Sequence, residues 1–199
     1  MYPYVGICLI MVCFGAFHSL TGREQIKNGI RSRLHLSTST YALLRSFVSL
    51  SLLVLSLVAL FKWAPGTLRI FHPVMGLIAI VPTMFAFWIA GMALGQVAKS
   101  RRLPQFFGVR EYPKVFYYSG AYSICRHPMY AGWLIASWGI VLSRPYLLTI
   151  VYNALLTIYV LYEALQEEKR MIELFGERYL QYRKRVPFII PYGFTRPPN

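Results

Sequence analysis

The chain has 199 residues, of which 56% are hydrophobic and only 14% are charged, and it contains no Asp. This composition is too apolar for an ordinary soluble domain of this size. The formal net charge is +14, but the Lys and Arg residues lie in links that flank apolar runs. That distribution is typical of membrane topology and of contact with anionic lipid headgroups, and it argues against a nucleic-acid-binding protein.

Three apolar runs in the first half of the chain predict transmembrane helices. They cover approximately residues 4–20, 41–61 and 74–96, and about 20 apolar residues in a helix cross the hydrocarbon core of a bilayer. The third run contains Gly91 and Gly95, whose spacing allows two helices to approach closely.

Two shorter apolar runs follow at residues 129–143 and 146–162, with Arg144 and Pro145 between them. Each is short for a membrane span, so we expect a hairpin of two short helices or one re-entrant element. From Glu163 onward the chain is polar and helical in pattern. The fold class that we predict is an all-α polytopic membrane helix bundle of about five transmembrane helices, with a C-terminal helical hairpin and a cytoplasmic C-terminal helix.

Two further patterns limit the chemistry. The three cysteines, Cys8, Cys13 and Cys125, form no Cys-x-x-Cys pair, and we predict no metal site. No Gly-rich strand-to-helix loop is present, which excludes a soluble domain with a dinucleotide-type fold.

The segment Arg126-His127-Pro128 stands where the polar middle of the chain meets an apolar run. Pro128 suits the first turn of a helix, because its missing N–H would be unpaired there. Arg126 would then lie at a helix N-terminus, where an anion is favoured. The alternative is that Arg126 only extends to lipid headgroups.

Acidic residues follow the last apolar run, at Glu163, Glu167 and Glu168. Carboxylates this close to a membrane are costly unless they are solvated or paired, so they are either part of a site or a solvated helix face. Further along, Tyr179 and Tyr182 share a helix face. Their rings could form the floor of an adenine-sized pocket or lie in the membrane interface.

Two longer strings carry a resemblance to a known family. The string SGAYSICRHPMYAG, residues 119–132, resembles the Gly-x-Tyr-x-x-x-Arg-His-Pro-x-Tyr-x-Gly stretch of isoprenylcysteine carboxyl methyltransferases and related phospholipid methyltransferases. The string EEKRMIELFGERYLQYRKRVPFIIPY, residues 167–192, is similar to the C-terminal signature of the same family. Together the strings cover roughly a third of the chain, in the family's order.

The resemblance implies an integral membrane, multi-pass enzyme that transfers a methyl group from S-adenosylmethionine. The cofactor would bind on the cytoplasmic side, and a small or lipophilic acceptor, a thiol or a prenylcysteine-like carboxylate, would enter from the bilayer. Besides membrane lipids and this acceptor no partner is implied, and no nucleic acid. The residues that we expect to form the cofactor site are Gly120, Tyr122, Arg126, His127, Pro128, Tyr130, Gly132, Glu167, Glu168 and Tyr179, with Arg126 and Glu168 as the catalytic pair.

The N-terminal half is similar, more loosely, to methanethiol S-methyltransferases. The segments that carry this likeness are His18-Ser19, residues 41–45 and residues 106–111. We therefore divide the chain into N-terminal transmembrane helices 1 to 3, residues 1–96, and a catalytic S-adenosylmethionine-binding part with helices 4 and 5 and a cytoplasmic tail, residues 97–199.

Two other interpretations belong to different classes. Membrane sterol and steroid reductases share an Arg-His-Pro-Asn-Tyr motif and use NADPH, but this chain has Met129 where they have Asn. A non-enzymatic, haem-related membrane protein would need an axial ligand, and His18 is the histidine that lies inside an apolar run.

The distribution of basic residues predicts the orientation. Lys and Arg are concentrated in the links at 21–40 and 97–128 and in the C-terminal tail, whereas the link at 62–73 holds few. We therefore expect the N-terminus outside and the C-terminus in the cytoplasm. Reporter fusions at residue 68 and at the C-terminus should report opposite sides of the membrane, and reports from the same side would contradict five crossings.

Overall fold

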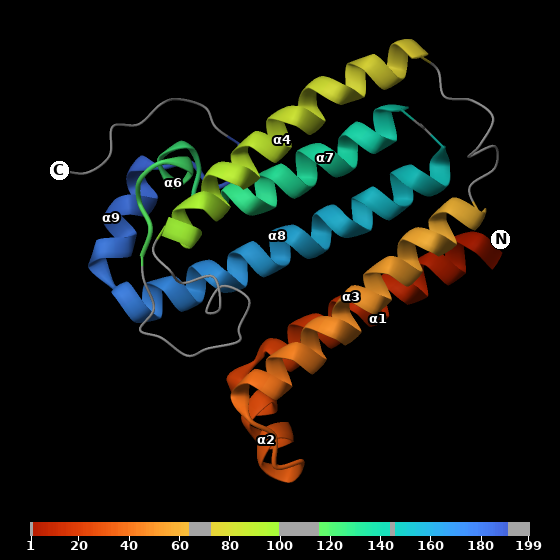
Figure 1. Cartoon of the computed structure of the whole chain (residues 1–199). Helices are drawn as coiled ribbons and strands as arrows, with labels where there is room; N and C mark the ends of the chain where they lie inside the picture. The colour runs from red at the N-terminus through yellow and green to blue at the C-terminus, as the bar shows by residue number, and fades with distance from the viewer. Residues whose placement is uncertain (1, 64–72, 100–115, 144–145, 191–199) are drawn as a thin grey trace. The chain divides into compact units, whose positions relative to one another are not determined.

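The computed structural model of the chain describes residues 2–63, 73–99, 116–143 and 146–190 (Figure 1). These residues form helices and, within the described ranges, no strand, so the all-α prediction is confirmed. The predicted segment at residues 106–111 and the break at residues 144–145 lie outside the described residues. The chain divides into two compact units. The division into residues 1–96 and 97–199 stays a prediction.

The first unit holds α1 (Tyr2–Gly22), α2 (Glu24–Arg33), α3 (Thr38–Trp63) and the start of α8 up to Leu156. Helices α1 and α3 pack side by side (Figure 1). Polar contacts connect them at one end, where the Tyr41 hydroxyl donates to the Thr21 carbonyl at 2.7 Å. At the other end, Gly6 lies under the ring of Trp63. Both helices therefore hold each other along most of their length.

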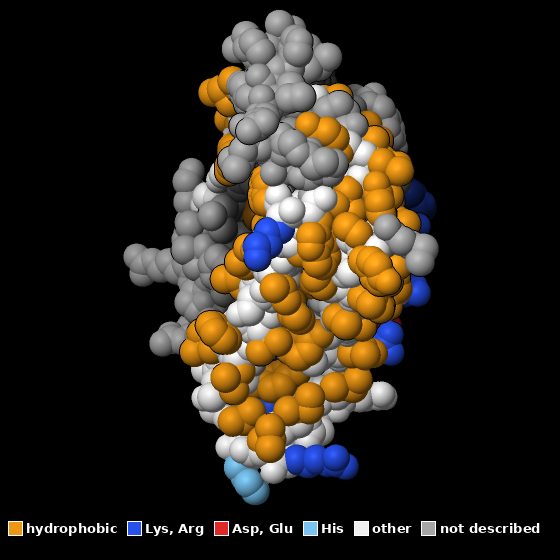
Figure 2. Space-filling model, turned by 90° about the vertical axis from the view of Figure 1, so that its right-hand side faces the viewer, with side chains coloured by type: hydrophobic (Ala, Val, Ile, Leu, Met, Phe, Trp, Pro, Cys, Tyr) orange, Lys and Arg blue, Asp and Glu red, His pale blue; other side chains and the backbone are white. Residues whose placement is uncertain are grey.

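Large hydrophobic side chains on these two helices point away from the protein. Leu9 of α1 and Phe47 of α3 are 60% and 70% exposed, and they are typical of the outward faces. Figure 2 shows hydrophobic side chains over much of one face of the molecule. In water such a surface would drive aggregation, whereas in a bilayer it is the ordinary surface of a membrane helix.

The second unit holds α4 (Pro73–Lys99), α6 (Ala121–Ile124), α7 (Pro128–Ser143), the rest of α8 (Leu147–Phe175) and α9 (Glu177–Arg185). Helices α4 and α7 pack along each other. The Trp138 indole N–H of α7 donates to the Thr157 hydroxyl of α8 at 3.0 Å. Helix α7 begins at Pro128, as the sequence predicted. A Cβ added at Gly91 or Gly95 would meet no described atom within 4 Å. The close helix approach expected at these two glycines is therefore not found among the described residues.

Helix α8 continues without a break from the last apolar run into the polar segment. It carries Glu163, Glu167 and Glu168 in its second half and ends at Phe175. Gly176 follows with φ +53°, a backbone conformation that glycine adopts at little cost. The chain turns there into α9, whose buried Tyr179 and Tyr182 pack with Phe116.

Three helices of the described residues are long and apolar enough to cross a membrane: α1, α3 and α8. This finding agrees with an integral membrane protein. Helix α7 has 16 residues and at about 1.5 Å per residue is shorter than the ~30 Å hydrocarbon core. The crossings predicted for α4 and α7, and with them the count of five, stay predictions.

The contact between Gly6 and Trp63 predicts that a large side chain destabilises the protein at Gly6 but not at Gly29. A Cβ at Gly6 would lie 2.6 Å from the Trp63 ring, whereas a Cβ at Gly29 of α2 meets nothing within 4 Å. We expect Gly6→Leu to lower the free energy of unfolding by about 1–3 kcal/mol, the usual cost of overpacking. Gly29→Leu is the matched control and should not destabilise the protein. Thermal unfolding of both variants in detergent measures the difference, and equal melting temperatures would show that α1 and α3 do not pack at Gly6.

Candidate functional site

The site forms where four segments of the second unit meet. The residues before α7 lie beside a short segment after α9, residues 186–189, which we call the strap. The Arg126 N–H donates to the Pro187 carbonyl at 2.8 Å, and the His127 N–H donates to the Phe188 carbonyl at 3.2 Å. These two backbone hydrogen bonds fix the Arg-His-Pro segment beside the last turns of α8 and α9.

Arg126 donates three of its five guanidinium N–H groups to protein oxygens. Its Nε donates to Glu168 Oε1 at 2.5 Å, and its Nη1 donates to the carbonyls of Val186 at 2.5 Å and Arg183 at 3.1 Å. Its guanidinium lies 5.4 Å from the centre of the Phe188 ring. The side chains of Arg126 and Glu168 are only 8% and 5% exposed. The structure therefore brings the predicted catalytic pair together as a buried ion pair.

Glu168 collects donors from three other residues. Its Oε1 accepts from the Tyr179 hydroxyl at 3.1 Å and lies 3.4 Å from His127 Nε2. Its Oε2 lies 3.4 Å from Arg183 Nε. A buried carboxylate is stable only when its charge is paired and its lone pairs are satisfied. The contacts around Glu168 meet that requirement and connect α7, α8 and α9 through one carboxylate.

The two tyrosines of α9 are held as hydrogen-bond donors. Burial raises the pKa of Tyr179 well above its usual range, and the negative charge of Glu168 raises it further. Burial also raises the pKa of Tyr182. The Tyr182 hydroxyl donates to the Tyr122 carbonyl at 2.6 Å. Both phenols therefore stay protonated at neutral pH, and their hydroxyls contact α6 and α8. The interpretation of the two rings as the floor of an adenine-sized pocket stays a prediction.

His127 lies between the buried pair and a more accessible carboxylate. Its ring packs edge-on against Phe188 at 5.0 Å and lies 5.7 Å from the Tyr130 ring. Its Nδ1 is 3.8 Å from Glu167 Oε2, and the Glu167 side chain is 50% exposed. His127 and the half-exposed Glu167 thus lie close together at the edge of the buried pair.

Glu163 adds the observation that bears most directly on a ligand. It lies one turn before Glu167 on α8, and both carboxylates interact electrostatically with Tyr130. Its Oε1 is buried and has no hydrogen-bond partner among the described residues. An unpartnered buried carboxylate oxygen is costly. A cationic group of a ligand bound between α7 and α8 would satisfy it, and the amino group of S-adenosylmethionine is such a group.

The remaining predicted residues have backbone or packing positions. Gly120 precedes α6 with φ +60°, and the Tyr122 ring stacks on Tyr117 at 5.7 Å. Pro128 is fully buried, and Gly132 is buried one turn further along α7. These four residues surround the Arg-His-Pro segment but offer no charged group to a ligand.

Sequence reasoning left three contributors off the predicted site. Glu163 belonged to the acidic group but not to the expected pocket, although its position one turn before Glu167 was a usable signal. Arg183 and Phe188 contact Glu168, Arg126 and His127 through the fold alone. Among the described residues, no group of three or more His, Cys and acidic side chains could hold a metal ion.

Comparison with known proteins identifies the class. The family model for phospholipid methyltransferase matches residues 71–178, which include the Arg-His-Pro segment and the carboxylates of α8. The match covers more than half of the chain, and the chain therefore belongs to the phospholipid methyltransferase family. The predicted resemblance is confirmed, and so, at the level of the family, is the prediction of a membrane methyltransferase.

Individual relatives fall into two groups. Methanethiol S-methyltransferase 1 of Bradyrhizobium diazoefficiens is 29% identical over 197 residues, which are 92% of this chain and 65% of the relative. Methanethiol S-methyltransferase of Crocosphaera subtropica is 28% identical over 90% of this chain and 71% of the relative. Protein-S-isoprenylcysteine O-methyltransferase of Mus musculus is 40% identical over 76 residues, which are 37% of this chain and 26% of the relative.

The chain thus spans 65% of the length of the Bradyrhizobium relative and 71% of the Crocosphaera relative. No solved structure matches the chain.

The buried pair predicts a strong energetic coupling between Arg126 and Glu168. Arg126→Met leaves a buried carboxylate without its main partner, and we expect a loss of about 3–5 kcal/mol in the free energy of unfolding. The double variant Arg126→Met/Glu168→Leu removes both charges and should lose less than the sum of the single variants. Denaturant unfolding of the wild type, the two single variants and the double variant in detergent gives the coupling energy of this double-mutant cycle. Arg185→Met, at an exposed residue of α9, is the matched control, and additive effects would mean that the pair is not buried.

Proposed function

We propose that the chain is an integral membrane methyltransferase that uses S-adenosylmethionine and methylates a small thiol. The observation that carries the proposal is the meeting of the Arg-His-Pro segment with the carboxylates of α8, one of which has an unpartnered buried oxygen. Family membership supports methyl transfer as the reaction class. The cofactor site on the cytoplasmic side of the membrane is part of the proposal.

S-adenosylmethionine, when bound, supplies a methyl group on a positively charged sulfur. The charge of the site suits this cofactor, because Glu163 and Glu167 are the carboxylates that remain for a cation once Glu168 is paired with Arg126. We assign Arg126 and Glu168 a positioning role, since each satisfies the other. Gly120, Tyr122, Pro128, Tyr130, Gly132 and Tyr179 would form and support the walls of the pocket.

A thiol acceptor must lose its proton before it attacks, because the thiolate is the nucleophile and an ordinary thiol has a pKa near ~8.5. His127 is the base that we propose. Its Nδ1 lies 3.8 Å from Glu167, which would stabilise the protonated ring. Arg126 is not available for this role, because a guanidinium stays protonated in proteins and cannot accept a proton. A proton taken by His127 would leave through the exposed Glu167 side.

The protein's own thiol at this place does not compete with the acceptor. Cys125 is buried directly before Arg126, and burial raises the pKa of its thiol to about 11. At neutral pH it is a thiol and not a thiolate, so it is a poor methyl acceptor.

The choice of a small thiol over a prenylcysteine rests on the extent of the matches. The methanethiol S-methyltransferases match over 90% or more of the chain, whereas the mouse prenylcysteine enzyme matches 37% of it. A prenylcysteine-like carboxylate is the second candidate, favoured by the 40% identity in that shorter region. Either acceptor is apolar enough to reach the site through the bilayer.

A radiolabelled transfer assay tests the proposal. Purified full-length protein with labelled S-adenosylmethionine should methylate methanethiol or a similar small thiol, more efficiently than a prenylcysteine, a phospholipid or a highly charged soluble thiol. The rate should rise with pH toward the pKa of the thiol when chemistry limits turnover. Tight NADPH binding with no methyl transfer to any acceptor would support the reductase interpretation instead.

A pair of variants tests the assignment of the cofactor site. Glu163→Gln removes the unpartnered carboxylate and should weaken S-adenosylmethionine binding about tenfold or more, the usual value of one charge-assisted contact. Glu173→Gln makes the same change at an exposed residue of α8 and is the matched control. Calorimetry on the folded proteins measures both. Equal affinities in the two variants would remove Glu163 from the site.

A further inference from the structure

A second site candidate lies in the first unit, away from the residues discussed above. A cavity of about 110 Å³ opens where α1 ends, α2 begins and α3 starts. A cavity needs roughly 10–15 Å³ to hold one water, so this one has room for a group of several heavy atoms. The polar side chains that line it are Thr21, Lys27, Thr38, Tyr41, Arg45 and Ser46. Two cations and four hydroxyls thus surround one small space.

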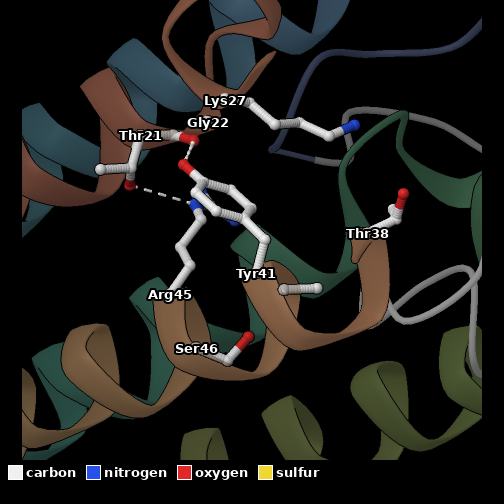
Figure 3. Close-up of a pocket in the computed structure, with 8 residues that line it drawn as sticks. Thr21, Gly22, Lys27, Thr38, Tyr41, Arg45 and Ser46 are labelled. Atoms are coloured by element: carbon white, nitrogen blue, oxygen red, sulfur yellow. Dashed lines mark hydrogen bonds between the residues drawn. The ribbon is translucent and has the colours of Figure 1, made fainter. Parts of the chain in front are cut away.

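Figure 3 shows how these side chains are arranged. Arg45 rises from α3 toward the end of α1, and in this view the Tyr41 ring lies between it and the Lys27 side chain of α2. The Arg45 Nη2 donates to the His18 carbonyl at 2.9 Å, and its Nε donates to the Thr21 hydroxyl at 3.3 Å. The Tyr41 hydroxyl donates to the Thr21 carbonyl. The guanidinium is therefore fixed in place beside the cavity.

The charge of the Arg45 guanidinium is not compensated within the described residues. Arg45 donates to neutral oxygens, and no carboxylate of the described residues forms an ion pair with it. Lys27 lines the same cavity and pairs with Glu24 at 3.3 Å, but the Glu24 side chain is 71% exposed, so water screens that pair. The oriented Arg45 cation at a partly buried place favours an anion.

The chemistry of the wall selects the type of anion. Guanidinium, ammonium and hydroxyl groups together are the donors that bind phosphate oxygens in proteins. The cavity lies at the ends of α1 and α3, which are two of the helices able to cross a membrane. The basic residues Arg23, Arg31 and Arg33 stand in or beside α2. Clusters of this kind beside membrane helices attract anionic lipid headgroups.

We propose that this cavity binds a phosphate group, that of an anionic phospholipid or a free phosphate, with the lipid favoured by its place at the end of two membrane helices. The bound phosphate would lie beside the oriented guanidinium of Arg45 of α3, in the cavity that Lys27 of α2 also lines. It would thereby hold the link between the first two membrane helices against the bilayer surface. This site is separate from the proposed methyl-transfer site and does not depend on that reaction.

Native mass spectrometry of the purified full-length protein tests the proposal. Phosphatidylglycerol, phosphatidylcholine and inorganic phosphate are the three probes. The wild type should retain phosphatidylglycerol in preference to phosphatidylcholine. We expect Arg45→Gln and Lys27→Gln each to weaken this retention about tenfold, the value of one charge-assisted contact. Lys62→Gln removes the same charge at an exposed position in the last turn of α3, at the opposite end of that helix from the cavity, and should retain the lipid as the wild type does.

The outcomes separate the alternatives. Lys27→Gln keeps the contacts of Arg45 with α1, so it tests the site even if Arg45→Gln fails to fold. Displacement of phosphatidylglycerol by inorganic phosphate, together with a higher melting temperature in phosphate, would support the site with free phosphate as its source. Retention of the lipid that phosphate cannot displace would identify the lipid. Equal retention of both lipids with no effect of phosphate, or equal losses in all three variants, would overturn the proposal.

Discussion

The buried ion pair between Arg126 and Glu168 is the interaction on which the rest of the catalytic unit depends. Removal of two charges from water costs several kcal/mol per ion, and mutual attraction alone does not offset that cost. Here the deficit is met by further partners: the carbonyls of Val186 and Arg183 for the guanidinium, and the Tyr179 hydroxyl for the carboxylate. The pair therefore requires α7, α8, α9 and the strap to be in place together.

This requirement explains why the three acidic residues Glu163, Glu167 and Glu168 of α8 differ in burial and in partners. Glu168 is buried and its charge is paired with Arg126. Glu167 is half-exposed beside His127, and one oxygen of Glu163 has no hydrogen-bond partner among the described residues. A helix with carboxylates at i, i+4 and i+5 can present them in this way because the residue at i+5 lies about 140° round the helix axis from the residue at i. One carboxylate is paired within the protein, and on our proposal the other two remain for a cationic ligand.

Arg126 of the second unit and Arg45 of the first unit, both partly buried, show opposite electrostatic situations. Arg126 meets a carboxylate and two carbonyls, so its charge is satisfied within the protein. Arg45 meets a carbonyl and a hydroxyl, which orient its guanidinium but leave its charge uncompensated among the described residues. An oriented and uncompensated cation favours a ligand anion, whereas a paired one holds elements together. An arginine thus holds helices together in the second unit, and on our proposal another arginine binds a phosphate in the first unit.

The sequence by itself determined the elements and the class of the protein. Apolar runs predicted α1, α3 and α4 to within a few residues, and Pro128 predicted the start of α7, because length, hydropathy and proline act locally along the chain. The two motif strings were sufficient to identify the family. The sequence also placed Arg126, His127 and the two carboxylates of residues 167 and 168 in one site, since both strings border apolar runs.

Only the tertiary structure decided what each of these residues touches. The sequence could not show that Arg126 and Glu168 neutralise each other, because that contact joins residues 42 positions apart through the strap. It could not distinguish Glu163 from a solvated carboxylate, since its burial depends on how α7 packs on α8. Nor could it assemble the cavity around Arg45 from three helices. Helix formation is dictated by neighbours in the chain, whereas pairing and burial of charge are dictated by neighbours in space.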